Sequence, residues 1–128
     1  MKLNFENAES GPKQLLFIEP NMEAAPRPVL DEITRKMAAS FAHAEEYGPR
    51  SRGFHICKCG AQSTNTDYKL PNDMVTNSLA VHYVAMHREE VPQEMLDEIT
   101  RFNDGETEPT EEMLQTKVFD RPYQDNYR

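Results

Sequence analysis

The side chains best suited to bind a transition metal in this sequence are two cysteines and four histidines. The cysteines form the pair Cys57-Lys58-Cys59, and after 22 intervening residues a second pair follows, His82 and His87, with four residues between them. Zinc takes four ligands in a tetrahedron, prefers thiolate and imidazole, and commonly receives them in pairs from a hairpin and a helix. The spacing therefore predicts one zinc ion per chain, held by Cys57, Cys59, His82 and His87.

Each pair needs a backbone that lets its two side chains converge. Side chains two apart on an extended strand point to the same side, so Cys57 and Cys59 can converge, and Gly60 then lets the chain turn and offer amide groups to the thiolates. On an ideal helix, residues five apart are separated by about 140° around the axis. We therefore expect His82 and His87 to converge through a tightened or unwound helix end.

The two remaining histidines, His55 and His43, have to be considered as alternative ligands. His55 is a rival ligand because it shares the predicted strand face with both cysteines, and its use would leave His82 or His87 free. Such a three-ligand site would have an open position for water, as catalytic zinc does. The carboxylates placed to act as a general base there are Asp67, Asp73 and Glu89. His43 is interpreted as a solvated or hydrogen-bonded histidine.

The surrounding pattern predicts an α+β domain. Apolar residues recur at helical spacing in three segments, and β-branched and aromatic residues alternate near the cysteines. We expect helices at 28–47, from a cap at Asn72, Asp73 or Thr76 to about residue 88, and at 92–103, with a β-hairpin formed by 54–60 and 68–70. Leu15 to Ile18 is a possible short strand, and a helical turn is possible after Pro109. The string Leu-Asp-Glu-Ile-Thr-Arg occurs at 30–35 and 96–101, but the flanks differ, which indicates two similar amphipathic helices rather than a duplicated unit.

Three segments follow from this pattern. Breakers crowd residues 1–26, which are expected to form an irregular N-terminal arm. Residues 27–105 form the predicted zinc-centred core domain, with its hairpin and helix at 53–88. Residues 106–128 form a C-terminal tail that is first acidic and then aromatic, with Phe119, Tyr123 and Tyr127 spaced four apart.

The metal pattern resembles the Cys2His2 zinc finger, in which a hairpin supplies two cysteines and a helix two histidines. The likeness covers residues 54–88, with one residue between the cysteines instead of two to four and 22 between the pairs instead of about twelve. Residues 53–61, 67–72 and 76–83 also look like small uncharacterised bacterial proteins, a likeness that brings no activity with it. The zinc-finger resemblance implies a structural metal joining the hairpin to the helix.

The charge is unevenly distributed along the chain. The net charge is -8, with five Lys/Arg against two Asp/Glu in residues 48–88 and four against twelve in residues 89–128. An acidic surface disfavours binding of the whole protein along DNA or RNA, although the mildly basic 48–88 segment allows a local contact. The N-terminus carries carboxylates where a secretory signal has an apolar core, which favours the cytoplasm.

These observations favour a small zinc-binding protein that works as a protein-binding adaptor or regulator, with a structural metal. The first alternative is a regulator that binds nucleic acid through residues 48–88. The second is a metal-dependent hydrolase with an open zinc position. The motifs of zinc proteases and zinc deaminases are missing from the sequence, and a closed set of four ligands leaves no room for a substrate.

Overall fold

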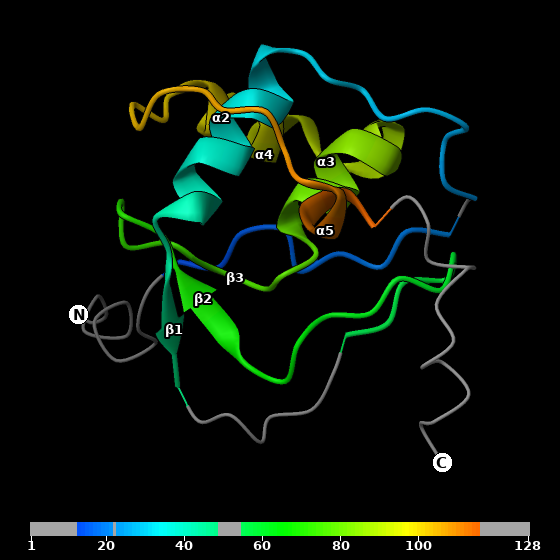
Figure 1. Cartoon of the computed structure of the whole chain (residues 1–128), viewed down its shortest axis with the longest axis horizontal. Helices are drawn as coiled ribbons and strands as arrows, with labels where there is room; N and C mark the ends of the chain where they lie inside the picture. Colours follow the sequence, from blue (N-terminus) through cyan, green and yellow to red (C-terminus); the bar gives the residue numbers. More distant parts are fainter. Residues whose placement is uncertain (1–12, 22, 49–54, 116–128) are drawn as a thin grey trace, which may run out of the picture.

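The structure, a computed structural model, describes residues 13–21, 23–48 and 55–115 (Figure 1). It has the α+β fold that the sequence predicts, and in the view of Figure 1 the helices lie above a small antiparallel sheet. The helices are α2 (Glu32–Ala42), α3 (Ala80–Met86), α4 (Gln93–Thr100) and α5 (Glu111–Leu114), with a 3-10 turn η1 (Arg88–Glu90). The strands are β1 (Glu45–Tyr47), β2 (Asp67–Lys69) and β3 (Val75–Thr76).

Helix α2 is shorter at both ends than the predicted helix over 28–47. It begins after Asp31, whose side chain accepts a hydrogen bond from the Thr34 amide at 3.1 Å and so caps the first turn. It ends at Ala42, and the residues predicted to continue it form β1 instead. Glu45 pairs across the sheet with Lys69, and this opposite-charge pair favours the strand over further helical turns.

The sheet has the order β1-β2-β3, with both pairs antiparallel. The prediction that residues 68–70 pair with the cysteine segment is therefore wrong, because β2 lies between β1 and β3. Leu15 to Ile18 does not form the predicted strand either. Gln14 makes a single parallel bridge to Val75, with Leu15 N donating to the Val75 carbonyl at 2.8 Å.

Helix α3 begins later than predicted. None of the residues proposed as its N-cap begins the helix. Thr76 belongs to β3, and the chain then turns at Asn77. The Asn77 side chain accepts a hydrogen bond from the Leu79 amide at 2.7 Å. All seven residues of α3 are buried, as its nearly uninterrupted apolar sequence predicts. Helices α2 and α5 pack against α3, and α4 packs against α2.

The last two helices agree closely with the sequence. The helix expected over 92–103 is α4, preceded by Pro92, and the turn expected after Pro109 is α5. Thr110 caps α5 by accepting from the Met113 amide at 3.1 Å. Leu15 and Leu16 from the N-terminal side and Leu114 from α5 complete the apolar core. None of the described helices is long and apolar enough to cross a bilayer.

Candidate metal centre

The structure brings the two predicted pairs into one cluster. One ligand atom from each residue lies within 4.8 Å of the other three, and we refer to this set as the metal cluster: Cys57, Cys59, His82 and His87. Three of these residues are buried and Cys59 is half-buried. Residues separated by 30 positions in the sequence thus present sulfur and nitrogen to a common point, as a metal ion requires.

The cysteines lie in a short hairpin of their own, residues 55–63, which we call the cysteine hairpin. Ser63 N donates to the His55 carbonyl and Cys57 N to the Ala61 carbonyl, while Ile56 pairs with Gln62. The two cysteines therefore converge through a tight turn rather than through strand alternation. Gly60 makes this possible, since its φ is 105° and its amide donates to the Cys57 carbonyl at 2.8 Å.

The histidines converge because α3 ends between them, as the spacing predicts. His82 lies in the first turn of α3, and the last α-helical residue is Met86. His87 has φ and ψ of -130° and 39°, and the chain then tightens into η1. This change of backbone places the two rings edge to face with centroids 5.0 Å apart, where a continued helix would have separated them.

The hydrogen bond at the far side of His82 fixes which ring nitrogen faces the cluster. His82 Nδ1 lies 2.7 Å from the Leu114 carbonyl oxygen. A carbonyl can only accept, so Nδ1 carries the hydrogen and the neutral ring turns the lone pair of Nε2 towards Cys59 Sγ, 3.3 Å away. Metal-ligating histidines characteristically donate their other ring nitrogen in this way.

His87 also turns its Nε2 towards a cysteine sulfur, but the surroundings of its Nδ1 differ from those in His82. Its Nε2 lies 3.3 Å from Cys57 Sγ, and its buried Nδ1 has no hydrogen-bond partner within the described residues. The nearest carboxylate oxygen, Glu90 Oε2, is 3.9 Å from Nδ1. A negative charge at that distance favours a hydrogen on Nδ1 and leaves Nε2 as the ligand atom.

The two thiols differ in their readiness to ionise. A hydrogen bond from the Cys57 thiol lowers the pKa of Cys59, and a hydrogen bond from the Ala61 amide acts in the same direction. The same bond between the two sulfurs, together with burial, raises the pKa of Cys57. The protein's own groups therefore already stabilise one thiolate, which is the form that binds metals.

The spacing of these atoms fits zinc. With Zn–S of about 2.3 Å and Zn–N of about 2.0 Å, a tetrahedral ion separates a sulfur from a nitrogen by about 3.5 Å. The two Sγ–Nε2 distances are both 3.3 Å. Two thiols and two imidazoles are also a donor set that soft and borderline transition metals prefer to calcium or magnesium. The cluster could therefore hold one metal ion with no further ligand from solvent.

The rival histidine lies outside this cluster. The His55 ring stacks on Phe17 with centroids 5.3 Å apart, and its Nε2 is 3.9 Å from Asp67 Oδ1. Asp67 thus faces His55, and Glu89 lies exposed in η1.

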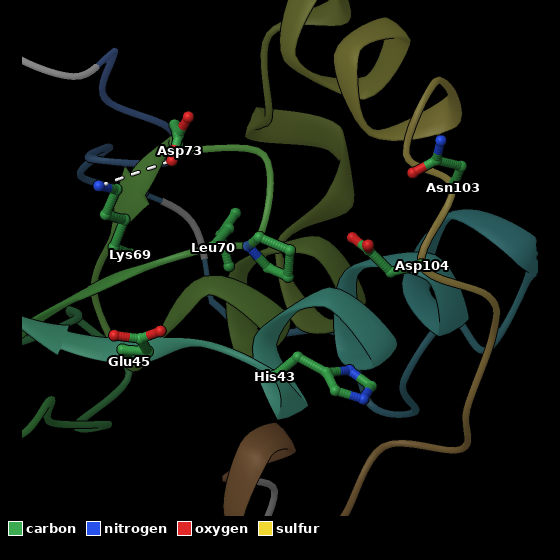
Figure 2. A pocket seen from close by; sticks show the side chains of 8 residues that line it. His43, Glu45, Lys69, Leu70, Asp73, Asn103 and Asp104 are labelled. Atoms are coloured by element: carbon green, nitrogen blue, oxygen red, sulfur yellow. Dashed lines mark ion pairs between the residues drawn. The ribbon is translucent and has the colours of Figure 1, made fainter.

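His43 and Asp73 belong to a different pocket, shown in Figure 2, where Asp73 pairs with Lys69 at 3.5 Å. The His43 Nδ1 bonds to the Ala39 carbonyl at 2.9 Å, in agreement with its interpretation as a hydrogen-bonded histidine.

Sequence reasoning missed two residues beside the metal cluster, Leu114 and Gln115. Leu114 acts through its backbone carbonyl, for which its residue type gives no signal. Gln115 adopts a left-handed conformation with φ of 55° and bonds to the backbone of Gln62 in the cysteine hairpin. Both lie in the segment predicted as a tail. The aromatic residues expected further along that tail lie outside the described residues.

Comparison with known proteins identifies no protein that is significantly similar to this chain. No family model matches this chain, and neither a curated protein nor a solved structure is significantly similar to it. The metal cluster and its surroundings are therefore the basis for functional inference.

Proposed function

We propose that this chain is a small zinc-binding protein in which Cys57, Cys59, His82 and His87 hold one structural zinc ion, and that it acts as a protein-binding adaptor or regulator in the cytoplasm. The observation that carries the zinc assignment is the convergence of two sulfurs and two nitrogens within 4.8 Å of one another. The fixed tautomer of His82 supports it, because that hydrogen bond directs a lone pair into the cluster.

The number of protein ligands favours a structural role. Structural zinc sites are closed by four protein ligands, whereas catalytic sites keep one position for water or substrate. The cluster offers four donors, two from the cysteine hairpin and two from α3 and the residue that follows it. Bound zinc would hold these elements together and supply part of the folding free energy.

The test is the metal content and coordination of the purified protein. We expect about one zinc per chain by elemental analysis, and a cobalt-substituted sample with the absorption bands of a tetrahedral site carrying thiolate ligands. X-ray absorption should give two sulfur and two nitrogen neighbours. A protein purified without metal that fails to take up zinc in titration would refute the assignment.

One observation keeps the hydrolase alternative testable. A cavity of about 540 Å³ borders Cys59 and His82, and its lining includes the carboxylates of Glu23 and Glu111. A substrate entering it would meet the metal only if one protein ligand were displaced. The X-ray absorption experiment tests this point as well, since one sulfur neighbour or one imidazole ring fewer than expected favours the hydrolase.

The adaptor role rests on surface charge. Four exposed acidic residues of the C-terminal third lie close together in sequence, along the loop before α5 and on α5 itself: Glu106, Glu108, Glu111 and Glu112. Such a surface attracts a basic protein partner, with association faster at low salt. Affinity capture with wild type and a Glu108→Gln/Glu112→Gln variant at two salt concentrations tests it. A partner retained equally by both proteins would mean that another surface binds it, and retention of nucleic acid instead would favour the regulator that binds through residues 48–88.

A further inference from the structure

The C-terminal end of α5 contacts both elements that carry the metal cluster. On one side the Leu114 carbonyl accepts from His82 Nδ1 of α3 at 2.7 Å. On the other side the Gln115 side chain makes two bonds to the backbone of Gln62, donating to its carbonyl at 3.0 Å and accepting from its amide at 3.4 Å. Gln62 in turn pairs with Ile56 across the cysteine hairpin. The end of α5 therefore bridges the two halves of the proposed zinc site.

The buried contacts of α5 are concentrated at its C-terminal end. Leu114 and Gln115 are each 7% exposed, whereas Glu111 and Glu112 are exposed to solvent and Met113 is half-buried. A helix of four residues is far too short to be stable by itself. Its last carbonyls have no helical partners, and one of them receives the His82 hydrogen bond. The position of this segment therefore depends on tertiary contacts, namely the burial of Leu114 in the apolar core and the bonds of Leu114 and Gln115 to the two elements that carry the metal cluster.

We infer that zinc binding and the docking of residues 110–115 are one coupled equilibrium, in which Leu114 and Gln115 position the zinc ligands. This inference rests on the zinc site proposed above. An ion bound at His82 Nε2 polarises the ring and makes Nδ1 a better donor to the Leu114 carbonyl. The carbonyl, in return, fixes the tautomer and makes Nε2 a better ligand. Because binding linkage is reciprocal, any factor by which docking strengthens zinc binding equals the factor by which zinc strengthens docking.

Because docking and zinc binding are coupled, the positions of the acidic residues of this segment depend on whether zinc is bound. Glu111 and Glu112 are carried by α5, so docking of Leu114 and Gln115 fixes where they lie relative to the domain. A basic protein that draws this segment away from the cysteine hairpin would weaken zinc binding by the factor by which docking had strengthened it. The segment is thus a point at which a partner and the metal can affect each other.

Zinc affinity measured with point variants of the full chain tests the positioning role. Gln115→Ala removes both bonds to Gln62, and loss of such supporting contacts typically weakens metal affinity about 10- to 100-fold. We expect at least a 10-fold rise in the zinc Kd, measured by competition with a chromogenic chelator. Gln115→Gly should behave alike, because glycine accepts the left-handed conformation and only the side-chain bonds are lost. The matched control is Gln93→Ala, which removes a side-chain bond to Asp97 on the remote helix α4 and should leave the Kd unchanged.

Amide hydrogen exchange tests the reciprocal effect. The Leu114 and Gln115 amides bond to the first turn of α5, while those of Met95 and Leu96 bond to Pro92 at the start of α4. Zinc should slow exchange of the α5 amides by a larger factor than that of the α4 amides. Equal factors, or an unchanged zinc Kd in both Gln115 variants, would overturn the coupling while leaving the zinc site intact. A wild-type protein that binds no zinc would instead refute the proposed function.

Discussion

The cysteine hairpin and the layer formed by α2 and α4 are stabilised in different ways. In the hairpin, His55, Ile56 and Lys58 are exposed, and Ile56 is 67% accessible to solvent. Its buried residues are small, and three short backbone hydrogen bonds close it. A hairpin of this size is marginal in water unless another element covers it.

The α2–α4 layer is held by apolar burial. Met37 and Ala38 of α2 and Ile99 of α4 are fully buried in the core, and Phe102 just after α4 is 6% exposed. Burying a large apolar side chain contributes about 1.5 to 3 kcal/mol, so this layer needs no additional ligand. The proposed zinc would stabilise the cysteine hairpin, whose buried residues are small, and the predictions below test this division.

Removal of the metal should have the largest effect. Chelation should lower the melting temperature by at least about 10 °C, because 1 kcal/mol corresponds to roughly 3 to 5 °C in a domain of this size and metal-binding energy is folding energy. Differential scanning calorimetry before and after treatment with a strong chelator, and again after adding zinc back, measures it. An unchanged melting temperature would mean that apolar burial stabilises both regions.

Substitution of single histidines should separate the metal cluster from its surroundings. His82→Ala and His87→Ala each remove one ligand and leave the other three, so we expect zinc to be lost during purification or bound at least 100-fold more weakly. His43→Ala and His55→Ala should retain one zinc per chain, since neither ring belongs to the cluster. Elemental analysis of the four variants decides between these ligand sets. If His55→Ala lost zinc and His82→Ala retained it, the ligand assignment would be wrong.

The convergence of the four metal-cluster residues could be predicted from the sequence, because the spacing of two cysteines and two histidines is a recognisable pattern. The separation of His82 and His87 even required the helix to end between them, and it does. The route by which the cysteines converge could not be predicted, since alternation along a strand and a tight turn at Gly60 place both thiols alike. The partner of β2 was also missed: Tyr68 can pair with any nearby edge, and its neighbours Glu46 and Thr76 are known only from the fold. The carbonyl of Leu114 has no counterpart in the sequence at all.

A core substitution should affect stability without affecting zinc. Ile99 is fully buried between α4 and the core, so Ile99→Ala should lower the free energy of unfolding by about 2 to 4 kcal/mol through lost burial and the cavity left behind. Urea denaturation of the zinc-loaded protein measures this loss, and metal content should remain one zinc per chain. Glu94→Ala, an exposed position on the same helix, serves as the control and should change stability by less than about 0.5 kcal/mol. Loss of zinc from Ile99→Ala would show that the two regions fold as one unit.

The smallest effect concerns the ion pair that joins the end of α3, beside the metal cluster, to the α2–α4 layer. Arg88, the residue after His87, donates to both carboxylate oxygens of Asp31 at 2.9 and 2.7 Å, and to the Val84 carbonyl. It therefore ties the unwound end of α3 to the N-terminal cap of α2. The hydrogen bonds from Arg88 lower the pKa of Asp31 to about 2 from its usual 3.8, against the opposing effect of partial burial.

Asp31→Asn should test this tie, because asparagine keeps a capping oxygen for the Thr34 amide but carries no charge for Arg88. The Asp31 side chain is 45% exposed, so solvent screening limits the expected loss to about 1 kcal/mol or less at pH 7. Since the pKa is lower in the folded chain than in the unfolded chain, the contribution is complete above about pH 4 and disappears as the pH falls towards 2. Zinc affinity also falls with acid in both proteins, so the quantity to follow is the difference between their unfolding free energies. A difference that stayed constant from pH 7 to pH 3 would locate the effect in the cap rather than in the ion pair, and Arg88 would then have no electrostatic role in linking the zinc side to the apolar side.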